Sequence, residues 1–387
     1  MKKPSLAPSL LGFLFFSPIV FSAAILHAEG PWDDEDRLMV SANTAYVQAA
    51  EGNFAAALEA EQNALQAAQD RFGPTHPSLA PFLTDLATLY RKMARYAEAE
   101  SALRWALALR EKNLGLEDPL TAQSLDQLAA LDSDLGRFEE AEVLEKRAVG
   151  IDRKTSPIPP GLASLLIHAG EIDLRLQKNA PALEYLSQGL ALIKNAASPA
   201  GSGPLKVEAL WASARADLRL GKIPEASAAL RQALNVAKQD SPSGLEQGDA
   251  LMRLADFDLS QKNQVQASAG YQSAFKIYQH FVGPDTSYAT LPYISRLAQA
   301  EEALGNEADA MALWKRVLET SRSVYGPAHP QTAVYLSDLA WTEENLGDPS
   351  GAAQHLQAAL AIFKSLYDPG HPLILETSNQ IQKLAGH

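Results

Sequence analysis

The sequence predicts an all-α fold: an α-solenoid, wound as a right-handed superhelix of eight helical hairpins, that ends in a capping helix. Three observations support this prediction. Hydrophobic residues make up 47% of the chain but aromatic residues only 7%, and alanine, leucine, glutamate and glutamine dominate, which is typical of close-packed helices. A short motif recurs every 41 to 44 residues. Columns of small residues accompany that motif at constant offsets.

The first 28 residues are predicted to be an export signal. Two lysines precede an apolar run at residues 10–21, and small residues follow, which is the order of a secretory signal peptide. Cleavage after Ala28 and cleavage after Ala24 both suit the pattern. An uncleaved membrane anchor is the alternative, although the apolar stretch is short for a span and contains Pro18. We therefore expect an exported protein, periplasmic or extracellular, whose mature chain is soluble.

The charge of the chain excludes some partners. The formal net charge is −13, and removal of the signal would leave 31 basic and 46 acidic side chains, a charge of −15. Nucleic acid is not an expected partner, because phosphate binding needs a basic surface. The chain has no cysteine, so it forms no disulfide and no thiolate metal site.

A five-residue motif marks each repeat. It reads Asn-Phe-Ala-Ala-Ala at 53–57, Arg-Tyr-Ala-Glu-Ala at 95–99 and Arg-Phe-Glu-Glu-Ala at 137–141, at a spacing of 42. Its final alanine continues through eight copies: Ala57, Ala99, Ala141, Ala182, Ala226, Ala267, Ala310 and Ala352. Eight hairpins are therefore expected over residues 37–372, after an acidic linker at residues 29–36.

Two further columns of small residues predict where the helices of each hairpin meet. One lies about twelve residues before the motif alanine: Ala45, Ala87, Ala129, Gly170, Ala214, Ala255, Ala298 and Ala340. The other lies seven residues after it, with Val317 as its one larger member: Ala64, Ala106, Ala148, Gly189, Ala233, Ala274, Val317 and Ala359. A residue that ends the first helix lies between the earlier of these columns and the motif alanine. It is glycine in five repeats and Ala94, Gln177 or Lys262 in the others, and glycine accepts the left-handed conformation at a helix end.

These columns, the glycine turn and the aromatic residue of the motif resemble the tetratricopeptide repeat, which is usually about 34 residues long. Residues 107–115 and the Arg-Phe-Gly-Pro-Thr-His-Pro stretch at 71–77 are similar to the 42-residue form found in kinesin light chains. The resemblance implies a concave groove lined by the first helix of each hairpin, with the ligand contacts on it. Kinesin light chains often carry paired asparagines there. This chain instead has Thr-Asp at 84–85, Asp-Gln at 126–127 and Ser-Asp at 337–338, so kinesin-type cargo binding is not implied.

The loops between repeats predict helix caps. Eleven residues before each first-helix small residue stand Asp34, His76, Asp118, Pro159, Gly203, Gly244, Ser287 and His329. Most of these are plausible N-caps, and proline follows several of them, where it suits the first helical position. His76, His329 and His371 share a His-Pro setting. We interpret them as loop caps and not as a metal cluster, because the repeat spacing separates them. A last amphipathic helix is expected in the capping segment at residues 373–387.

The sequence carries no signature of an active site. A nucleophile elbow, a phosphate-binding loop and a zinc motif are all missing from it. We therefore predict no enzyme, no catalytic residue, no metal and no small-molecule cofactor.

Function is instead expected on the groove face of the first helices. The candidate partner-binding residues there are Tyr46, Arg91, Lys92, Trp211, Arg215, Arg219 and Trp341. In an acidic chain, such basic and aromatic islands suit protein or peptide partners with acidic or carboxylate groups. The alternative is that Trp211 packs between hairpins and the arginines pair with acids of the next repeat.

The sequence thus predicts an exported scaffold that holds protein or peptide partners. Two other functions remain open at this point. One is an accessory subunit of an envelope assembly, anchored by an uncleaved N-terminus. The other is an enzyme whose site is assembled across repeats without a sequence signature.

Overall fold

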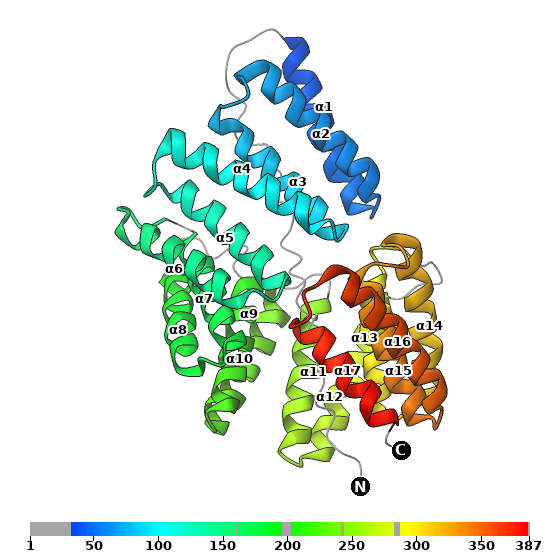
Figure 1. Ribbon diagram of the computed structural model, residues 1–387. Coiled ribbons are helices and arrows are strands. Elements are labelled where there is room, and N and C mark those ends of the chain that lie inside the picture. The colour runs from blue at the N-terminus through cyan, green and yellow to red at the C-terminus, as the bar shows by residue number, and fades with distance from the viewer. Residues whose placement is uncertain (1–31, 160, 196–202, 241–243, 282–286, 386–387) are drawn as a thin grey trace. The chain divides into compact units, whose positions relative to one another are not determined.

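The computed structural model describes residues 32–159, 161–195, 203–240, 244–281 and 287–385. These described residues form seventeen α-helices and a short 3-10 helix, with no strand among them (Figure 1). The all-α prediction is therefore confirmed. None of the helices in these ranges is long and apolar enough to cross a membrane. The predicted signal peptide, residues 1–28, lies outside the described residues.

The described chain forms two compact units, and the boundary between them falls after Leu165. The first unit contains α1 (Trp32–Ala50), α2 (Phe54–Phe72), η2 (Pro77–Leu79), α3 (Ala80–Lys92), α4 (Tyr96–Leu114), α5 (Pro119–Asp134) and α6 (Phe138–Lys154). The boundary lies within α7 (Leu162–Arg175). In the first unit α1 packs on α2, α3 on α4 and α5 on α6, and each hairpin also packs on the next through α2–α3 and α4–α5.

The second unit begins in α7 and repeats the same arrangement. Its further helices are α8 (Asn179–Asn195), α9 (Gly203–Arg219), α10 (Ile223–Asp240), α11 (Leu245–Ser260), α12 (Gln264–Phe281), α13 (Leu291–Leu304), α14 (Glu307–Val324), α15 (Pro330–Asn345), α16 (Pro349–Leu366) and α17 (Pro372–Ala385). From α9 to α16 they pair into four hairpins, and each hairpin packs on its neighbour. A Cβ atom at Gly170 would lie 2.7 Å from Leu186 Cγ, so α7 and α8 also approach closely.

The three columns of small residues form the buried contacts within and between hairpins, as the sequence predicted. Every alanine of the three columns is at most 1% exposed, and Val317 is 0% exposed. Gly170 and Gly189 are buried as well. Side chains this small let helix backbones approach. The register of the repeat is therefore confirmed along both units.

The turns between paired helices have the left-handed backbone that the glycine positions predicted. The five glycines there have φ between 73° and 84°, and Ala94, Gln177 and Lys262 adopt φ of 55°, 61° and 65° in the same place. In each of these three turns the next residue donates its backbone N–H to a carbonyl five residues earlier, as from Asn263 to Asp258 at 2.8 Å. This is the Schellman arrangement of a helix end. Three repeats thus hold a strained turn without glycine.

The predicted histidine caps are confirmed. Nδ1 of His76, His329 and His371 accepts a backbone N–H two residues later, at 3.2, 3.1 and 3.3 Å. Each imidazole also stacks on the aromatic ring four residues before it, as His371 does on Tyr367 with ring centroids 4.0 Å apart. Similar stacks hold His76 and His329. The three histidines are therefore built into separate loops.

The two ends of the array are closed differently. At the C-terminal end, Ile381 and Leu384 of α17 pack on the Ala340, Ala352 and Leu356 cluster, as expected of a capping helix. At the N-terminal end, α1 begins at Trp32, so residues 32–36 of the acidic segment are helical and Asp34 lies inside the helix, not at its cap. Acidic residues are favourable in a first helical turn because they face the positive end of the helix dipole.

Candidate partner-binding face

All seven predicted partner-binding residues lie on first helices of hairpins, but they are divided between the two units. Tyr46 is on α1, and Arg91 and Lys92 are at the end of α3, in the first unit. The others belong to the second unit: Trp211, Arg215 and Arg219 on α9, and Trp341 on α15. The prediction therefore corresponds to two separate groups of side chains.

The two basic residues of the first unit, Arg91 and Lys92, have contacts with other residues of that unit. Arg91 donates from Nε and Nη2 to Asp134 Oδ2 of α5, at 2.8 and 2.6 Å. Lys92 lies 5.9 Å from the centroid of the Phe54 ring, and burial, with the neighbouring Arg91 charge, lowers its pKa to about 8. Arg91 pairs with an acid of the next repeat, which is the alternative that the sequence left open for the arginines.

The arginines of the second group, Arg215 and Arg219 on α9, also have partners within the protein. Arg215 Nη2 contacts Glu171 Oε1 at 3.2 Å, and Arg219 Nη1 donates to the Leu174 carbonyl at 2.7 Å. Both partners belong to the preceding repeat, on α7, and not to the following one. Trp211 is half-buried among the apolar residues of α9, α10 and α11, so its ring packs between hairpins as the alternative proposed.

The structure adds two arginines to this island that the sequence reasoning missed. The guanidinium of Arg253, on α11, lies over the Trp211 ring at 4.3 Å from its centroid, which is a cation–π contact. Arg296, on α13, donates from Nε to Asp249 Oδ1 at 2.9 Å. We call Arg215, Arg253, Arg296 and Trp211 the arginine face. Its four residues come from three successive first helices of the second unit.

The electrostatics of the arginine face follow from burial and from these pairs. Burial lowers the pKa of Arg253 to about 10, and the charges of Arg296 and Arg215 add to this effect against the attraction of Asp249. The pKa of Arg296 is raised, chiefly by Asp249. Tyr278 donates its hydroxyl to the same Asp249 oxygen at 2.7 Å, and its own pKa is raised, first by burial. Arg253 and Arg296 therefore remain charged at neutral pH.

A simple signal would have located these added arginines. Both stand two residues before the first-helix small residue, and so do the acids Asp85 and Asp338. The predicted residues stand at other offsets, since Tyr46, Arg215 and Trp341 follow the small residue directly and Trp211 stands three residues before it. Adjacent positions on a helix point about 100° apart. The predicted offsets therefore did not include the ionisable residues that stand two positions before the small residue.

Two predicted aromatic residues lie open to solvent. Tyr46 on α1 is 49% exposed and Trp341 on α15 is 42% exposed. Each follows directly after the small residue of its first helix. A large aromatic ring that remains exposed on this side of a hairpin is a suitable anchor for a partner.

Burial raises the pKa of several acids near the first helices. Glu61 of α2 is fully buried, neither carboxyl oxygen has a hydrogen-bond partner, and burial with the Asp85 charge raises its pKa to about 9. Burial raises the pKa of Asp85 to about 7. In the second unit, burial raises the pKa of Glu302 to about 7 and that of Asp338 to about 8. Glu302 accepts hydrogen bonds from Trp314 and Thr342.

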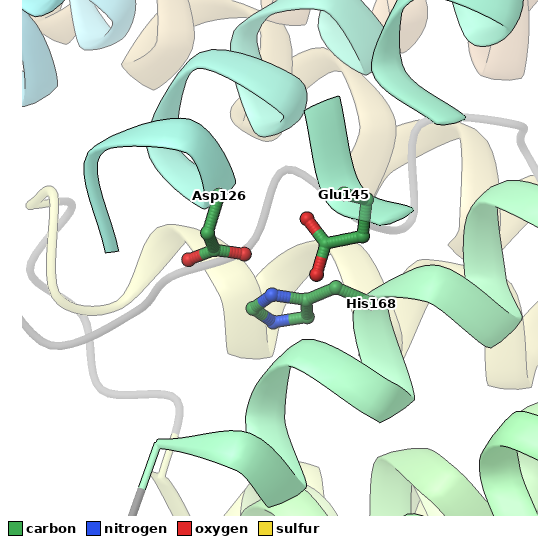
Figure 2. A group of neighbouring side chains, drawn as sticks. All are labelled: Asp126, Glu145 and His168. Atoms are coloured by element: carbon green, nitrogen blue, oxygen red, sulfur yellow. The ribbon is translucent and has the colours of Figure 1, made fainter. Parts of the chain in front are cut away.

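Two more buried acids, Asp126 of α5 and Glu145 of α6, lie in the first unit (Figure 2). His168, which the figure also labels, is on the part of α7 that belongs to the second unit. We therefore do not treat the three side chains as one metal site. The sequence reasoning had assigned no metal ligand to them.

Comparison with known proteins identifies the repeat. A family model described as tetratricopeptide repeat matches residues 37–112, 83–154 and 289–365, which together make up half of the chain. None of the curated proteins compared with it matches.

Solved structures of low sequence identity are similar to this chain. TPR-like repeats assigned to a kinesin light chain of Podosopora anserina are 20% identical, with 64% of this chain and 97% of that chain covered and a TM-score of 0.39. BtubC (BKLC) from P. vanneervenii is 16% identical, with 61% and 92% covered and a TM-score of 0.42. A Rap protein complexed with competence and sporulation factor is 13% identical, with 91% and 98% covered and a TM-score of 0.49. These likenesses add nothing about what this chain binds.

The repeated hairpins, the three buried columns of small residues and the match of the family model over half of the chain agree with one another. This protein belongs to the tetratricopeptide-repeat family.

Proposed function

We propose that this protein is an exported scaffold that binds a protein or peptide partner through the first helices of its hairpins and has no catalytic activity of its own. Membership of a family of helical repeats supports an interaction role, because stacked repeats present extended binding surfaces. The observation that carries the proposal is the arginine face. Three arginines stand on successive first helices of a chain whose net charge is −13, and the guanidinium of one of them, Arg253, lies over the Trp211 ring.

The charge of this face favours an acidic partner. Most of the surface of the chain repels a negatively charged protein or peptide, since acids outnumber bases by 46 to 33. A local group of arginines would direct such a partner to one place and orient it there. The exposed Trp341 offers an apolar anchor on a first helix of the same unit. The proposed partner therefore carries acidic groups and at least one apolar side chain.

Export rests on the N-terminal sequence alone. Two lysines, an apolar run and a small-residue segment support a signal peptide that is cleaved after Ala28 or Ala24, which would place the mature chain in the periplasm or outside the cell. Intact-mass measurement of the protein from its native host tests this. A mature chain beginning at Glu29 or Ile25 agrees with export, whereas a chain that keeps its first 28 residues favours a membrane-anchored accessory subunit.

We also assign the repeats to the 42-residue form. The spacing of 41 to 44 residues between motif alanines supports this assignment. The second helices are long, as in α10, α12, α14 and α16 with 18 residues each. A second helix of this length accounts for part of the surplus over a 34-residue repeat.

Site-specific photo-crosslinking in the native host tests the binding face. A photoreactive benzoylphenylalanine in place of Trp341 or Leu218, both exposed on first helices, should give adducts with the partner. The same substitution at Val265, which is 80% exposed on the second helix α12, is the matched control and should give none. Equal adducts from all three positions, or adducts from Val265 alone, would show that the first helices are not the binding face.

A further inference from the structure

The outer side of α1 exposes apolar side chains at positions that the other repeats bury. Val40 is 64% exposed and Val47 is 42% exposed, and they lie seven residues apart on the first helix of the first hairpin. In the other seven repeats the residue at the Val47 position is at most 6% exposed. A spacing of seven places both valines on the same side of the helix. We call Val40, Ser41, Thr44 and Val47, which share this side, the end face.

The second unit shows what covers this side of a first helix elsewhere. Ala250 and Phe257 of α11 stand at the positions of Val40 and Val47. Each belongs to a buried cluster that also contains residues of α10, the second helix of the preceding hairpin. The end face of a first helix is therefore where the preceding second helix packs. Since α1 is the first helix of the described chain, none of the described second helices precedes it.

The two other positions of the end face are polar in α1. Leu251 and Leu254 occupy them in α11 and pack against the same clusters, whereas α1 has Ser41 and Thr44. The Thr44 hydroxyl donates to the Val40 carbonyl at 2.7 Å, so a partner that covers Thr44 leaves no unsatisfied hydroxyl donor. Polar residues on the outer side of a terminal repeat keep the array soluble. A mixture of valines with small polar residues is typical of an interface that is not permanent.

The charge of α1 favours one kind of partner helix. Residues 33–36, which follow Trp32 at the start of α1, are Asp-Asp-Glu-Asp, and the last turn of α1 has no basic residue. A second helix runs antiparallel to the first helix that follows it, because the connection between them is short. A helix that packs on the end face in the same way brings its C-terminal turn beside these four acids. Basic residues in that turn are attracted to them and also suit the end of the helix dipole.

The chain left after the proposed cleavage is too short before α1 to supply such a helix. Cleavage after Ala24 or Ala28 would leave only residues 25–31 or 29–31 there. Seven residues make about two helical turns, whereas the second helices have 17 to 19 residues, as in α8 and α2. A second copy that docked through its own α1 would bring another acidic end and no basic one. Length and charge thus both favour a helix from another protein.

We propose that the end face of α1 binds an amphipathic helix of a partner protein, with its apolar side on Val40 and Val47 and basic residues in its C-terminal turn. The partner helix takes the place that the second helix of a preceding repeat would take. This inference rests on the export in the proposed function, because an uncleaved chain keeps its own apolar N-terminal residues before α1. The end face belongs to the first unit, whereas the arginine face belongs to the second.

Fluorescence anisotropy with a defined helix tests the end face. The probe is a labelled peptide with the sequence of α8, residues 179–195, which packs on α9 in the structure. It is amidated at its C-terminus, and a staple between the exposed positions Ser187 and Ala191 keeps it helical, because short isolated helices are marginal in water. In α9 the residue at the Thr44 position is also a hydroxyl residue, Ser213. We expect saturable binding to the mature chain, and its absence would overturn the proposal.

Variants of the protein locate the contact. Val47→Asp places a charge on the end face and should weaken binding by about tenfold or more, and Val40→Asp serves as the second variant where Val47→Asp loses helical content. Val143→Asp, at a 68% exposed position of the second helix α6, is the matched control and should change the affinity less than about twofold. Equal affinity of the wild type and the folded end-face variant would overturn the site.

A variant of the peptide tests the basic end. α8 has Lys194 in its last turn, and a peptide with Lys194→Glu should bind more weakly than the parent peptide. The difference should shrink as salt is raised, because screening weakens the attraction to residues 33–36. Equal affinity of the two peptides at low salt would overturn the assignment of a basic C-terminal turn to the partner.

Photo-crosslinking from Val40 in the native host identifies the occupant. Benzoylphenylalanine at this position should give an adduct with another protein, and mass spectrometry should map it to an amphipathic helical segment with lysine or arginine at its C-terminal end. An adduct within the chain, to residues 1–31, would assign the face to the chain's own N-terminus. An adduct with a second copy of the chain would assign it to self-association. Either of these results, or no adduct, would overturn the proposal.

Failure of the end face is distinguishable from failure of the proposed function. If the peptide does not bind and Val40 gives no adduct while Trp341 and Leu218 still crosslink to a partner, the end face is wrong and the scaffold stands. If peptide binding depends on Val47 and Val40 crosslinks while Trp341 and Leu218 give no adducts, the end face stands and the binding face of the proposed function is wrong. Intact-mass measurement tests export independently of both.

Discussion

Glu61 is a carboxylic acid that the fold keeps protonated. It lies on α2, is fully buried and makes no hydrogen bond with either oxygen. Burial, and then the Asp85 charge, raise its pKa from 4.5 to about 9. In the unfolded chain the same group ionises near its ordinary pKa, since water solvates it. The folded protein therefore binds one proton more than the unfolded protein between these two values.

The sign and size of the effect on stability follow from this proton. A group whose folded pKa is raised contributes its full stability below the unfolded pKa and loses it as pH rises toward the folded pKa. Within that window the free energy of unfolding falls by about 1.4 kcal/mol for each pH unit. From about pH 5.5 to about pH 8, Glu61 alone accounts for a loss on the order of 3 kcal/mol. Asp85, with a pKa of about 7, acts in the same direction.

Glu61→Gln removes this ionisation and keeps the size and polarity of the side chain. We expect the variant to be more stable than the wild type by roughly 3 kcal/mol near pH 8, and close to it near pH 5. The matched control is Glu59→Gln, which changes an exposed glutamate of the same helix. Because repeats unfold locally, hydrogen exchange of the α2 and α3 amides, followed by mass spectrometry across this pH range, is the direct assay.

Two results would refute the reasoning about Glu61. If wild-type protein and Glu61→Gln lose protection of α2 equally as pH rises, the carboxyl group is not the source of the pH dependence. If Glu61→Gln is less protected than the wild type at about pH 8, the buried group must be charged and stabilised there, contrary to its raised pKa.

Three further predictions concern the repeat itself. Lys262→Gly places glycine where φ is 65° and should stabilise the protein by up to about 1 kcal/mol in denaturant titration; no gain would mean that the turn carries no strain. Ala226→Leu forces a large side chain into a contact that is 0% exposed and should cost about 1–3 kcal/mol, seen as a lower melting temperature; an unchanged melting temperature would contradict the register. His329→Ala removes the acceptor for the Gln331 N–H and should cost about 1 kcal/mol, whereas His329→Asp should retain most of the stability; an equal loss in both would assign the effect to the stack on Tyr325.

The periodic features of the fold were predictable from the sequence because they are local and repeated. A small residue is needed wherever two helix backbones approach, and eight copies make the column visible without any knowledge of the fold. The left-handed turn is visible for the same reason, and its alignment even located Ala94, Gln177 and Lys262, where the residue type alone gives no hint. The histidine caps followed from their position beside proline at a helix start.

The pairing of charges on the first helices was decided only by the tertiary structure. Arg91 pairs with Asp134 on the following repeat, but Arg215 pairs with Glu171 on the preceding one. Nothing in the local sequence distinguishes the two directions. Which partner is reached depends on how a long side chain crosses from one hairpin to the next. The same limit hid the contact of Arg253 with Trp211 and that of Arg296 with Asp249, because each joins residues more than 40 positions apart.

What the sequence by itself determined about this protein is the repeat: helix, turn, helix and loop, in register through eight copies, with a cap at the end. That much follows from the spacing of small residues and turn residues, which depends on backbone geometry alone. The tertiary structure decided the chemistry of the faces, such as the neutral Glu61 in the core and the arginine face on α9, α11 and α13. Charge and burial depend on neighbours that the fold brings together, and these neighbours have no fixed spacing in the chain.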